Sequence, residues 1–430
     1  MSALPLAATA RSGGLRAAPG AAQAAPAEDA PGRPHGPDYP LLTAAAMLVI
    51  IGLIAVYSSS FALGFLQFDD AHHFAKRQAV WAALGVAGMI AVTRLDYRIW
   101  LRLSPLLMLV ALLGLAAVLV PGLGVEQNGA RRWVQIGPLP SVQPSEFAKL
   151  AVTIYLAAWL ATKGDAVRSF SLGVIPFVGM VGIVGALVML EPDLGTTLII
   201  AVITGSLFFV AGSRLWHVLM LAASGLFATL LLIATGGYRM DRILSFTSAE
   251  ADPEGVGFQT LQLLVAFGSG GISGLGLGAS RQKFFFVPGS HTDGVLAIIG
   301  EELGLIGVLV VVALVAMLLW RGLVIARRAG DSFGSLLATG IVVWIGVQAL
   351  VNAGGVTRLI PLTGIPFPFL SSGGSSLTIT LLAVGLLLSI SRRAAMGPPG
   401  APAAETAPRG VAPRSRAGAR ARPEPGGGAR

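Results

Sequence analysis

The sequence predicts an all-α polytopic membrane protein with about ten transmembrane helices. Apolar residues make up 54% of the 430-residue chain and charged residues only 12%, about half the charged share of a soluble protein. The mean hydropathy is +0.76, and apolar stretches of roughly 20 residues, long enough to cross a bilayer, recur along the chain. These observations exclude a water-soluble enzyme and a nucleic-acid-binding protein. The absence of cysteine excludes a disulfide scaffold, a thiolate nucleophile and a Cys-ligated metal site.

The membrane domain is expected between two tails. The N-terminal tail (1–40) and the basic C-terminal tail (394–430) are rich in Ala, Gly, Pro and Arg. Such segments cannot bury enough apolar surface to fold, so we expect both to be disordered. No positive segment precedes the short apolar run near the N-terminus, so no cleaved signal peptide is expected. In the domain 41–393, the expected spans lie near residues 41–61, 78–95, 103–121, 146–162, 171–190, 194–212, 215–235, 294–320, 333–352 and 373–391.

The distribution of Lys and Arg predicts the orientation of these spans. With both termini in the cytoplasm, the short inner loops are denser in Lys and Arg than the longer outer loops, as membrane proteins require. This placement explains the net charge of +9 without a nucleic-acid partner. The long loop 236–292, between the seventh and eighth spans, then lies outside. Its stretch Thr260–Phe267 is apolar with a helical period, which predicts a short interfacial helix.

Two charged pairs flank the start of the fourth span. Ser145 follows a proline and is expected to cap the helix, which puts Glu146 and Lys149 three residues apart on one face. They could form a simple ion pair at the membrane edge. Charges at membrane depth also tend to mark functional pathways, and both interpretations stay open. Arg131 and Arg132 could anchor lipid headgroups or bind a phosphate.

A second pair of arginines follows the seventh span. Arg239 and Arg242 lie three residues apart on the predicted outer side, a spacing that suits a phosphate or pyrophosphate. Interfacial anchoring explains them almost as well. The Glu191-Pro192-Asp193 corner between the fifth and sixth spans favours a simpler role, in which Asp193 caps the next helix.

The glycine-rich segment 268–278 leads to the richest set of polar residues. The glycines are not a nucleotide-binding loop, because no β-α-β unit surrounds them. Lys283 and His291 follow, and Asp293 stands at the start of the eighth span, where helix capping is the simpler role. Glu301 and the adjacent glutamate lie about two turns deeper, so they must face a polar cavity or pair with a cation.

A proline-rich segment precedes the last span. Three prolines within residues 361–368 forbid a continuous helix. Irregular backbone at membrane depth survives only where protein or water covers it. We therefore expect this segment and the following Ser-Ser-Gly-Gly-Ser-Ser stretch, which includes Ser375, to line the same cavity.

Taken together and in this order, the clusters resemble the SEDS family of cell-wall polymerases, which includes FtsW, RodA and SpoVE. The resemblance covers about residues 41–393. It rests on the motifs NGARRW, QPSEFAKL, EPDLGT, GFQTLQ, GSGG, RQKFFFVPGSHTD, GEELG and PFPFLSSGGSS. Within the family, the RQK, HTD and IGEELG motifs look more like FtsW, which acts in cell division, or its sporulation relative SpoVE, than like RodA, which acts in elongation.

The resemblance implies a SEDS fold and a peptidoglycan glycosyltransferase. Such an enzyme polymerises lipid II on the outer face of the bacterial cytoplasmic membrane, at the septum for an FtsW-like member, by inverting transfer with undecaprenyl pyrophosphate as leaving group. It implies a bitopic class B penicillin-binding protein and other division proteins as partners. The resemblance identifies no cofactor, and a requirement for a divalent cation (Mg or Mn) is left open.

The resemblance also suggests site residues. It places the essential aspartate at Asp293. The candidate substrate-binding residues are Arg131, Arg132, Glu146, Lys149, Arg239, Arg242, Lys283, His291, Glu301 and Ser375. Four positions depart from the family's usual residues: Glu191, Gly294, Arg358 and Ser372.

Two other classes of function remain open. A transporter that flips lipid-linked precursors would place its essential carboxylates near the midplane, as with Glu301 and Glu302. A division scaffold without catalysis would leave the clustered outer charges without a role.

Overall fold

The computed structural model describes residues 36–393 apart from 128–129, 136, 138–139, 235–236, 253, 256 and 285, and the side chains of Gln127, Tyr238, Arg239 and Ala251. The predictions of disorder therefore fall almost entirely outside the described residues.

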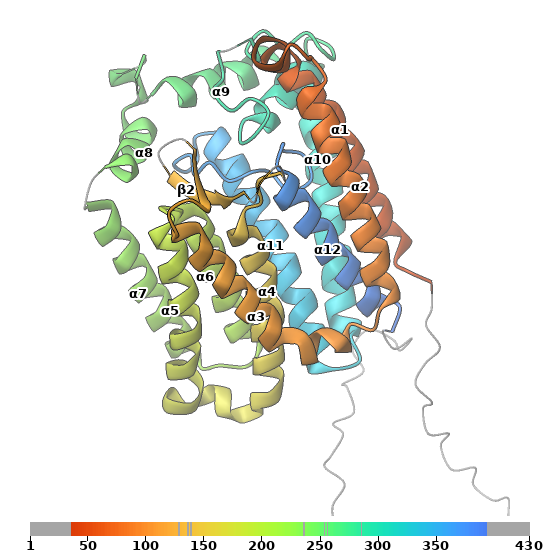
Figure 1. The fold of residues 1–430 in the computed structure, drawn as a ribbon, viewed down its shortest axis with the longest axis vertical. Coiled ribbons are helices and arrows are strands. Elements are labelled where there is room, and N and C mark those ends of the chain that lie inside the picture. Colours follow the sequence, from red (N-terminus) through yellow and green to blue (C-terminus); the bar gives the residue numbers. More distant parts are fainter. Residues whose placement is uncertain are drawn as a thin grey trace, which may run out of the picture. The chain divides into compact units, whose positions relative to one another are not determined.

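Ten helices of the described chain fall on the ten predicted spans (Figure 1). Eight of them are long and apolar enough to cross a membrane. Of the other two, α6 has only 17 residues, and α2 carries Lys76, Arg77 and Arg94. The bounds are α1 Tyr39–Phe68, α2 His73–Arg94, α3 Arg98–Leu119, α4 Pro144–Lys163, α5 Ile175–Leu190, α6 Leu194–Val210, α7 Leu215–Ala234, α10 Val295–Arg328, α11 Ser332–Val356 and α12 Gly374–Ser391. Two short helical turns, η1 Gly164–Arg168 and η2 Phe170–Val174, join α4 to α5.

Burial differs strongly between these helices. In α11, 72% of the most apolar stretch is buried, against 6% in α7. Helix α12 packs against α2, α3 against α4, and α10 against both α1 and α11. A helix that is apolar on all sides suits either the protein core or lipid. Here α11 takes the first environment, and α7 exposes nearly its whole surface.

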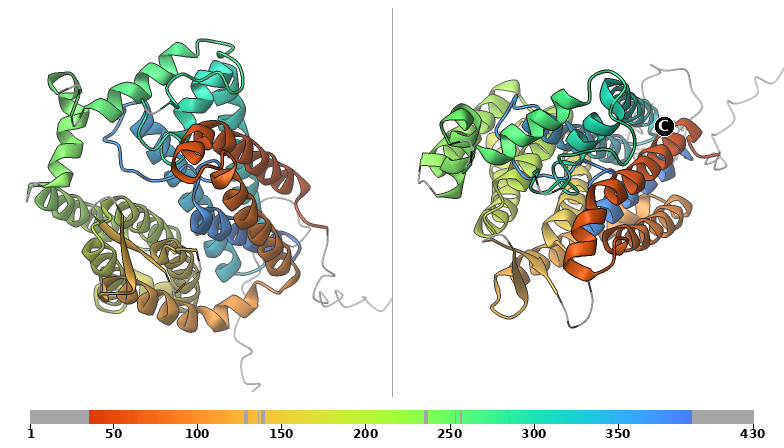
Figure 2. Two further views of the ribbon diagram at one scale, coloured as in Figure 1. Left: turned by 45° about the horizontal axis from the view of Figure 1, so that its top comes forward. Right: turned by 90° about the horizontal axis from the view of Figure 1, so that it is seen from above.

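The segment between α7 and α10 holds further structure (Figure 2). It forms α8 Tyr238–Thr247, the short turn η3 Ala249–Ala251 and α9 Phe258–Ser269. Helix α9 covers the stretch for which the apolar period predicted a helix. A small antiparallel hairpin, β1 Gly124–Gln127 and β2 Ala130–Val134, joins α3 to α4. This hairpin was not predicted from the sequence.

Helix α10 is interrupted two turns after its start. Gly304 has φ 65° and ψ −163°, a conformation that only glycine adopts without strain. The backbone carbonyls of Glu301 and Glu302 accept hydrogen bonds of 2.9 Å from Leu275 and Gly276. The backbone groups freed by the break are thus paired with the glycine-rich loop, as burial requires.

Candidate functional site

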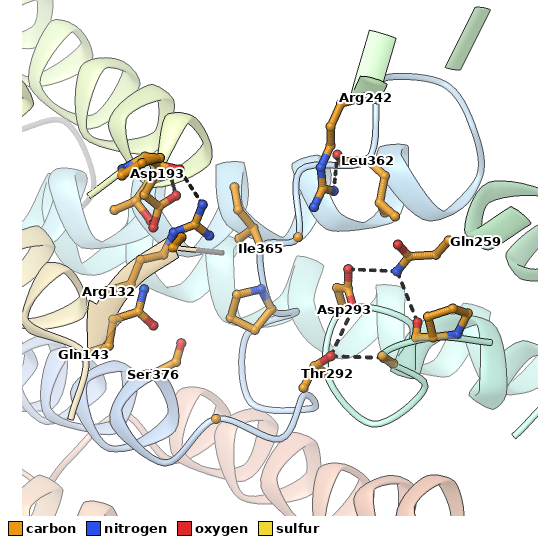
Figure 3. A pocket seen from close by; sticks show the side chains of 18 of the residues that line it. Arg132, Gln143, Asp193, Arg242, Gln259, Thr292, Asp293, Leu362, Ile365 and Ser376 are labelled. Atoms are coloured by element: carbon orange, nitrogen blue, oxygen red, sulfur yellow. Dashed lines mark hydrogen bonds between the residues drawn. The ribbon is translucent and has the colours of Figure 1, made fainter. Parts of the chain in front are cut away.

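A cavity of about 880 Å³ lies where the predicted clusters meet (Figure 3). Its wall is made by β2, the first turns of α4, α6 and α12, helices α8 and α9, the loop before α10 and the loop before α12. Its charged lining residues are Arg132, Glu146, Asp193, Asp241, Arg242 and Asp293. Segments as far apart in the sequence as Ala130 and Ser376 therefore contribute to one cavity at one end of the spanning helices.

Asp293 is buried in this lining, only 9% exposed. Thr292 Oγ1 donates to its Oδ1 at 3.0 Å, and Gln259 Nε2 approaches Oδ2 at 3.4 Å. Burial raises the pKa of the Asp293 carboxyl, while the Thr292 hydrogen bond and the nearby Arg242 charge oppose that rise. A carboxyl of this kind holds a proton more readily than an exposed aspartate, which suits a general base.

The loop around Asp293 leaves room for its carboxylate and fixes its backbone. Gly289 has φ 68°, and a Cβ there would lie 2.3 Å from Asp293 Oδ1. Asn352 Nδ2, on α11, donates to the backbone carbonyl of Asp293 at 2.9 Å and holds the backbone of the loop in place.

The N-cap of α10 is Gly294, with no side-chain cap hydrogen bond. Helix capping by Asp293, the simpler interpretation of the sequence, is therefore wrong.

Arg242 approaches the same part of the cavity from α8. Its Nη1 donates to the carbonyl of Leu362 at 2.6 Å, which ties α8 to the loop before α12. The close view shows this side chain pointing toward the cavity across from Asp293 (Figure 3). A guanidinium held at a cavity wall by a neutral carbonyl keeps its full positive charge for an anionic ligand.

The paired arginines of the hairpin point to different sides. Arg132 lines the cavity, where its Nε donates to the carbonyl of Glu191 at 3.2 Å and its Nη2 to that of Pro192. Arg131 is exposed and pairs with Glu126 at 3.4 Å. Because successive side chains of a strand point to opposite faces, only one of the two can face the cavity.

Glu146 and Lys149 form the predicted ion pair, with Nζ and Oε1 2.9 Å apart and both side chains buried. Lys149 also donates to Gln348 Oε1 at 2.9 Å. Glu146 lines the cavity, and its Oε2 has no hydrogen-bond partner among the described residues. The pair is therefore both an intrahelical bridge and part of the cavity wall.

The predicted caps fared differently. Asp193 accepts from the backbone nitrogen of Thr196 at 3.0 Å and caps α6 as expected. The predicted Ser145 cap of α4 is wrong, because the helix starts at Pro144, two residues earlier than predicted, and its N-cap is Gln143. Pro144 at the first helical position has a fixed φ that suits a helix start and lacks an N–H to be capped.

Two predicted residues lie away from the cavity, in a buried polar cluster. Lys283 Nζ lies 2.8 Å from Glu302 Oε1, and Ser58 Oγ donates to the same oxygen at 2.7 Å. Glu301 accepts from Ser280 Oγ at 2.5 Å and from the backbone nitrogen of Arg281 at 2.9 Å. Both glutamates are thus satisfied by the loop that docks on the break in α10.

Two more predicted residues of the described chain, His291 and Ser375, are also outside the lining. His291 packs against the Phe74 ring, with centroids 4.8 Å apart, and burial lowers the pKa of its imidazole. Ser375 accepts from the backbone nitrogen of Gln143 at 3.1 Å. Arg239 belongs to α8, but its side chain lies outside the described residues.

Several residues around the site were not singled out from the sequence. Gln259 and Thr292 contact the Asp293 carboxylate, whereas Gln348 and Asn352 lie behind the cavity wall. The spacing of the last two, four residues apart in an apolar span, is a signal that could have found them, since polar residues at membrane depth need partners.

The described residues contain no group of three or more His, Cys, Asp or Glu side chains placed to hold a metal ion. A cation in the cavity would have to use scattered carboxylates together with ligand oxygens.

With this geometry in hand, comparison with known proteins identifies the family. The family of cell cycle proteins that groups FtsW, RodA and SpoVE matches residues 39–396. The chain belongs to the SEDS family. Stage V sporulation protein E of Bacillus subtilis is 45% identical over 356 residues, 83% of this chain and 97% of that protein. A probable peptidoglycan glycosyltransferase FtsW of Geobacter metallireducens is 42% identical over 356 residues, 83% of this chain and 95% of the relative.

Solved structures of SEDS proteins share the fold. A chain of a peptidoglycan synthase complex, solved to explain how polymerisation and crosslinking are coordinated, aligns with a TM-score of 0.67 and 31% identity over 83% of this chain and 98% of that one. RodA of Thermus thermophilus aligns with a TM-score of 0.61 and 29% identity over 83% and 97%. These matches confirm the predicted helical membrane fold and the predicted family.

The structure describes the surroundings of Gly294, Ser372 and Glu191, three of the four residues that depart from the usual pattern of the SEDS family. Gly294 leaves room for Leu263 and Val287, whose methyl carbons lie 3.1 Å from where a Cβ would stand. Ser372 donates its backbone N–H to the backbone carbonyl of His291 at 2.8 Å. Glu191 is fully buried, and neither of its carboxylate oxygens has a hydrogen-bond partner among the described residues.

The buried carboxyl of Glu191 should make the stability of this SEDS protein depend on pH. Burial, with a smaller contribution from Asp193, raises its pKa from 4.5 to about 8. The folded state therefore binds one more proton than the unfolded state between these values, so stability falls as pH rises through that window. The melting temperature in detergent should decline from pH 5 to pH 8, and Glu191→Gln should flatten the decline. A variant with the slope of the parent would show that Glu191 does not hold this proton.

Proposed function

We propose that this chain is a peptidoglycan glycosyltransferase that polymerises lipid II. Two similar proteins, one named as a glycosyltransferase and one from a peptidoglycan synthase complex, support the proposal. The observation that carries it is a single cavity lined by a buried carboxylate, Asp293, and by two arginines, Arg132 and Arg242. This combination suits transfer of a sugar from a pyrophosphate carrier.

The proposed reaction uses Asp293 as the general base. An acceptor sugar hydroxyl attacks the anomeric carbon of a lipid-linked sugar, and its proton passes to the Asp293 carboxylate. A new glycosidic C–O bond forms as the C–O bond to the pyrophosphate breaks, with inversion at the anomeric carbon. Thr292 and Gln259 orient the carboxylate, and the Asn352 contact holds the backbone beneath it.

Arg132 and Arg242 would meet the charge of the departing undecaprenyl pyrophosphate. Preorganised cations are most effective where charge develops in the transition state. Alanine at either position should lower turnover of lipid II by ~10-fold or more, measured as initial rates with purified protein. The exposed ion pair of Arg131 offers the comparison, since Arg131→Ala should cost far less. Normal rates for both cavity variants would mean that the pyrophosphate is held elsewhere.

The decisive experiment is polymerisation of labelled lipid II by the purified protein. Glycan strands resolved on a gel would support the proposal, with and without a class B penicillin-binding protein as partner. No polymer under either condition, from protein that stays folded, would contradict it.

The described structure does not place Glu301 and Glu302 where the competing transport function would need its carboxylates. A proton-coupled flippase would need carboxylates that face the cavity near the midplane. In the described structure, Glu302 pairs with Lys283, and Glu301 bonds the neighbouring loop. Neither carboxylate lines the cavity.

We further propose an FtsW-like role at the division septum, with a class B penicillin-binding protein and other division proteins as partners. The FtsW-like motifs and the relatives named FtsW support this choice. The relative from Bacillus subtilis named for sporulation makes a SpoVE-like role the alternative. Growth of a conditional depletion strain separates them, because loss of a division polymerase gives filaments and loss of a sporulation polymerase leaves growth intact.

The proposed orientation puts both termini in the cytoplasm and the cavity outside. The chain has no cysteine, so single cysteines can report sidedness without background. Cysteine in place of the exposed Glu254, between α8 and α9, should react with a membrane-impermeant maleimide in intact cells. Cysteine in place of the exposed Gly330, between α10 and α11, should react only after permeabilisation. Labelling of both from the same side would overturn this topology.

A further inference from the structure

Arg358 occupies a backbone position that ordinarily favours glycine. It follows the C-cap of α11, Thr357, and has φ 55° in the left-handed region. That region disfavours residues with a Cβ, which is why glycine is common just after helix ends. A long charged side chain at such a position needs contacts that compensate for the backbone conformation.

The Arg358 side chain makes those contacts with the segment that follows α8. Its Nη1 and Nη2 both bond the Glu250 carboxylate, the second at 3.0 Å. Its Nε donates to the carbonyl of Phe246, in the last turn of α8, at 3.0 Å. The Arg358 guanidinium thus makes a bidentate contact with the Glu250 carboxylate. Its positive charge lies at the C-terminus of α8, where the helix dipole favours a cation.

Among the described residues, helix α8 makes few contacts with other helices, and it carries the cavity residue Arg242. It joins α7 to α9 at the margin of the spanning helices (Figure 2). Across the cavity mouth, Arg242 on α8 bonds the carbonyl of Leu362. The chain segment 358–362 therefore holds α8 at two points, through Arg358 at its end and through Arg242 at its middle.

We propose that Arg358 and Glu250 form a clamp that positions α8, so that Arg242 is held at the cavity to bind the anionic part of the substrate. Arg358 is a positioning residue, since its own side chain does not line the cavity. This inference rests on the proposed function, because it assigns Arg242 to the pyrophosphate of a lipid-linked sugar.

The test uses two variants that open the clamp from opposite sides, Arg358→Gly and Glu250→Gln. Glycine relieves the left-handed backbone, and an exposed ion pair contributes little to stability, so Arg358→Gly should melt no lower than the parent protein. Both variants should raise the KM for lipid II by about 3- to 10-fold, because small displacements of a binding group weaken its contacts. The kcat should fall as well, because Arg242 also meets the charge that develops on the departing pyrophosphate.

Three controls separate positioning from general damage. Lys76→Gln removes the exposed ion pair between Lys76 on α2 and Asp70 in the loop before it and should leave KM unchanged. In an Arg242→Ala background, Arg358→Gly should add no further rise in KM, because the group that it positions is gone. Amide hydrogen exchange over Tyr238–Thr247 should be faster in both clamp variants than in the parent.

The outcomes distinguish this inference from the proposed function. If the parent protein makes no polymer, the proposed function fails, and hydrogen exchange of α8 still reports whether the clamp holds the helix. If the parent polymerises lipid II while both variants keep its KM and its α8 exchange, the clamp is overturned. Additive effects of Arg358→Gly and Arg242→Ala would likewise overturn the link between Arg358 and Arg242.

Discussion

Replacing Asp293 by asparagine should abolish glycan polymerisation while leaving the protein folded. Asparagine has nearly the same shape and can keep the hydrogen bond from Thr292, but it cannot take a proton from the acceptor hydroxyl. General base catalysis contributes about 10²- to 10⁴-fold, so the rate of lipid II polymerisation should fall by that factor. Because Asp293 does not cap α10, no loss of helix stability complicates the result.

A second carboxylate of the same cavity provides the matched control. Asp241 also lines the cavity, from α8, but the described structure shows it exposed. Asp241→Asn removes the same charge and should cost far less activity than Asp293→Asn. Thermal melting of both variants in detergent should match that of the parent. Near-parental polymerisation by Asp293→Asn would remove Asp293 as the base.

The spanning helices could be predicted from the sequence because hydropathy is a local property. Each apolar stretch must satisfy its own backbone in lipid, and a helix does so within the segment. The break in α10 could not be predicted in this way, because it depends on a partner 30 residues earlier. The Gly270–Gly276 loop donates hydrogen bonds to the backbone carbonyls of Glu301 and Glu302. Without these bonds, the non-helical Gly304 would leave backbone groups unpaired in a buried helix.

The site was predictable as a set of clusters but not as a set of contacts. Arg131 and Arg132 are adjacent arginines that the sequence cannot distinguish. Only the alternation of side chains along a hairpin that was not predicted decides which of them faces the cavity. Glu301 and Glu302 carried the expected signal of costly buried charge, yet Glu301 bonds the neighbouring loop and Glu302 pairs with Lys283 of that loop. A buried charge requires a partner, and the sequence does not say whether that partner is the protein or a ligand.

The buried pair of Glu146 and Lys149 should give the largest effect on stability. Removing one partner of a buried ion pair typically costs about 3–5 kcal/mol, because the other charge remains uncompensated. Lys149→Met leaves the Glu146 carboxylate in place after its only described hydrogen-bond donor is lost. Its melting temperature and its yield in membranes should therefore fall strongly.

The double variant Glu146→Leu/Lys149→Met decides whether the two charges act as partners. Replacing a buried ion pair by apolar side chains is often neutral or stabilising, so the double variant should melt well above Lys149→Met. Glu146→Leu alone should be milder than Lys149→Met, since Lys149 would keep its bond to Gln348 and its place over the Trp344 ring, 5.3 Å from the centroid. A double variant no more stable than either single variant would show that the charges are independent. Activity should follow a different order, because Glu146 also lines the cavity: the double variant should recover stability without recovering polymerisation. That separation would assign the pair to the fold through Lys149 and to the reaction through Glu146.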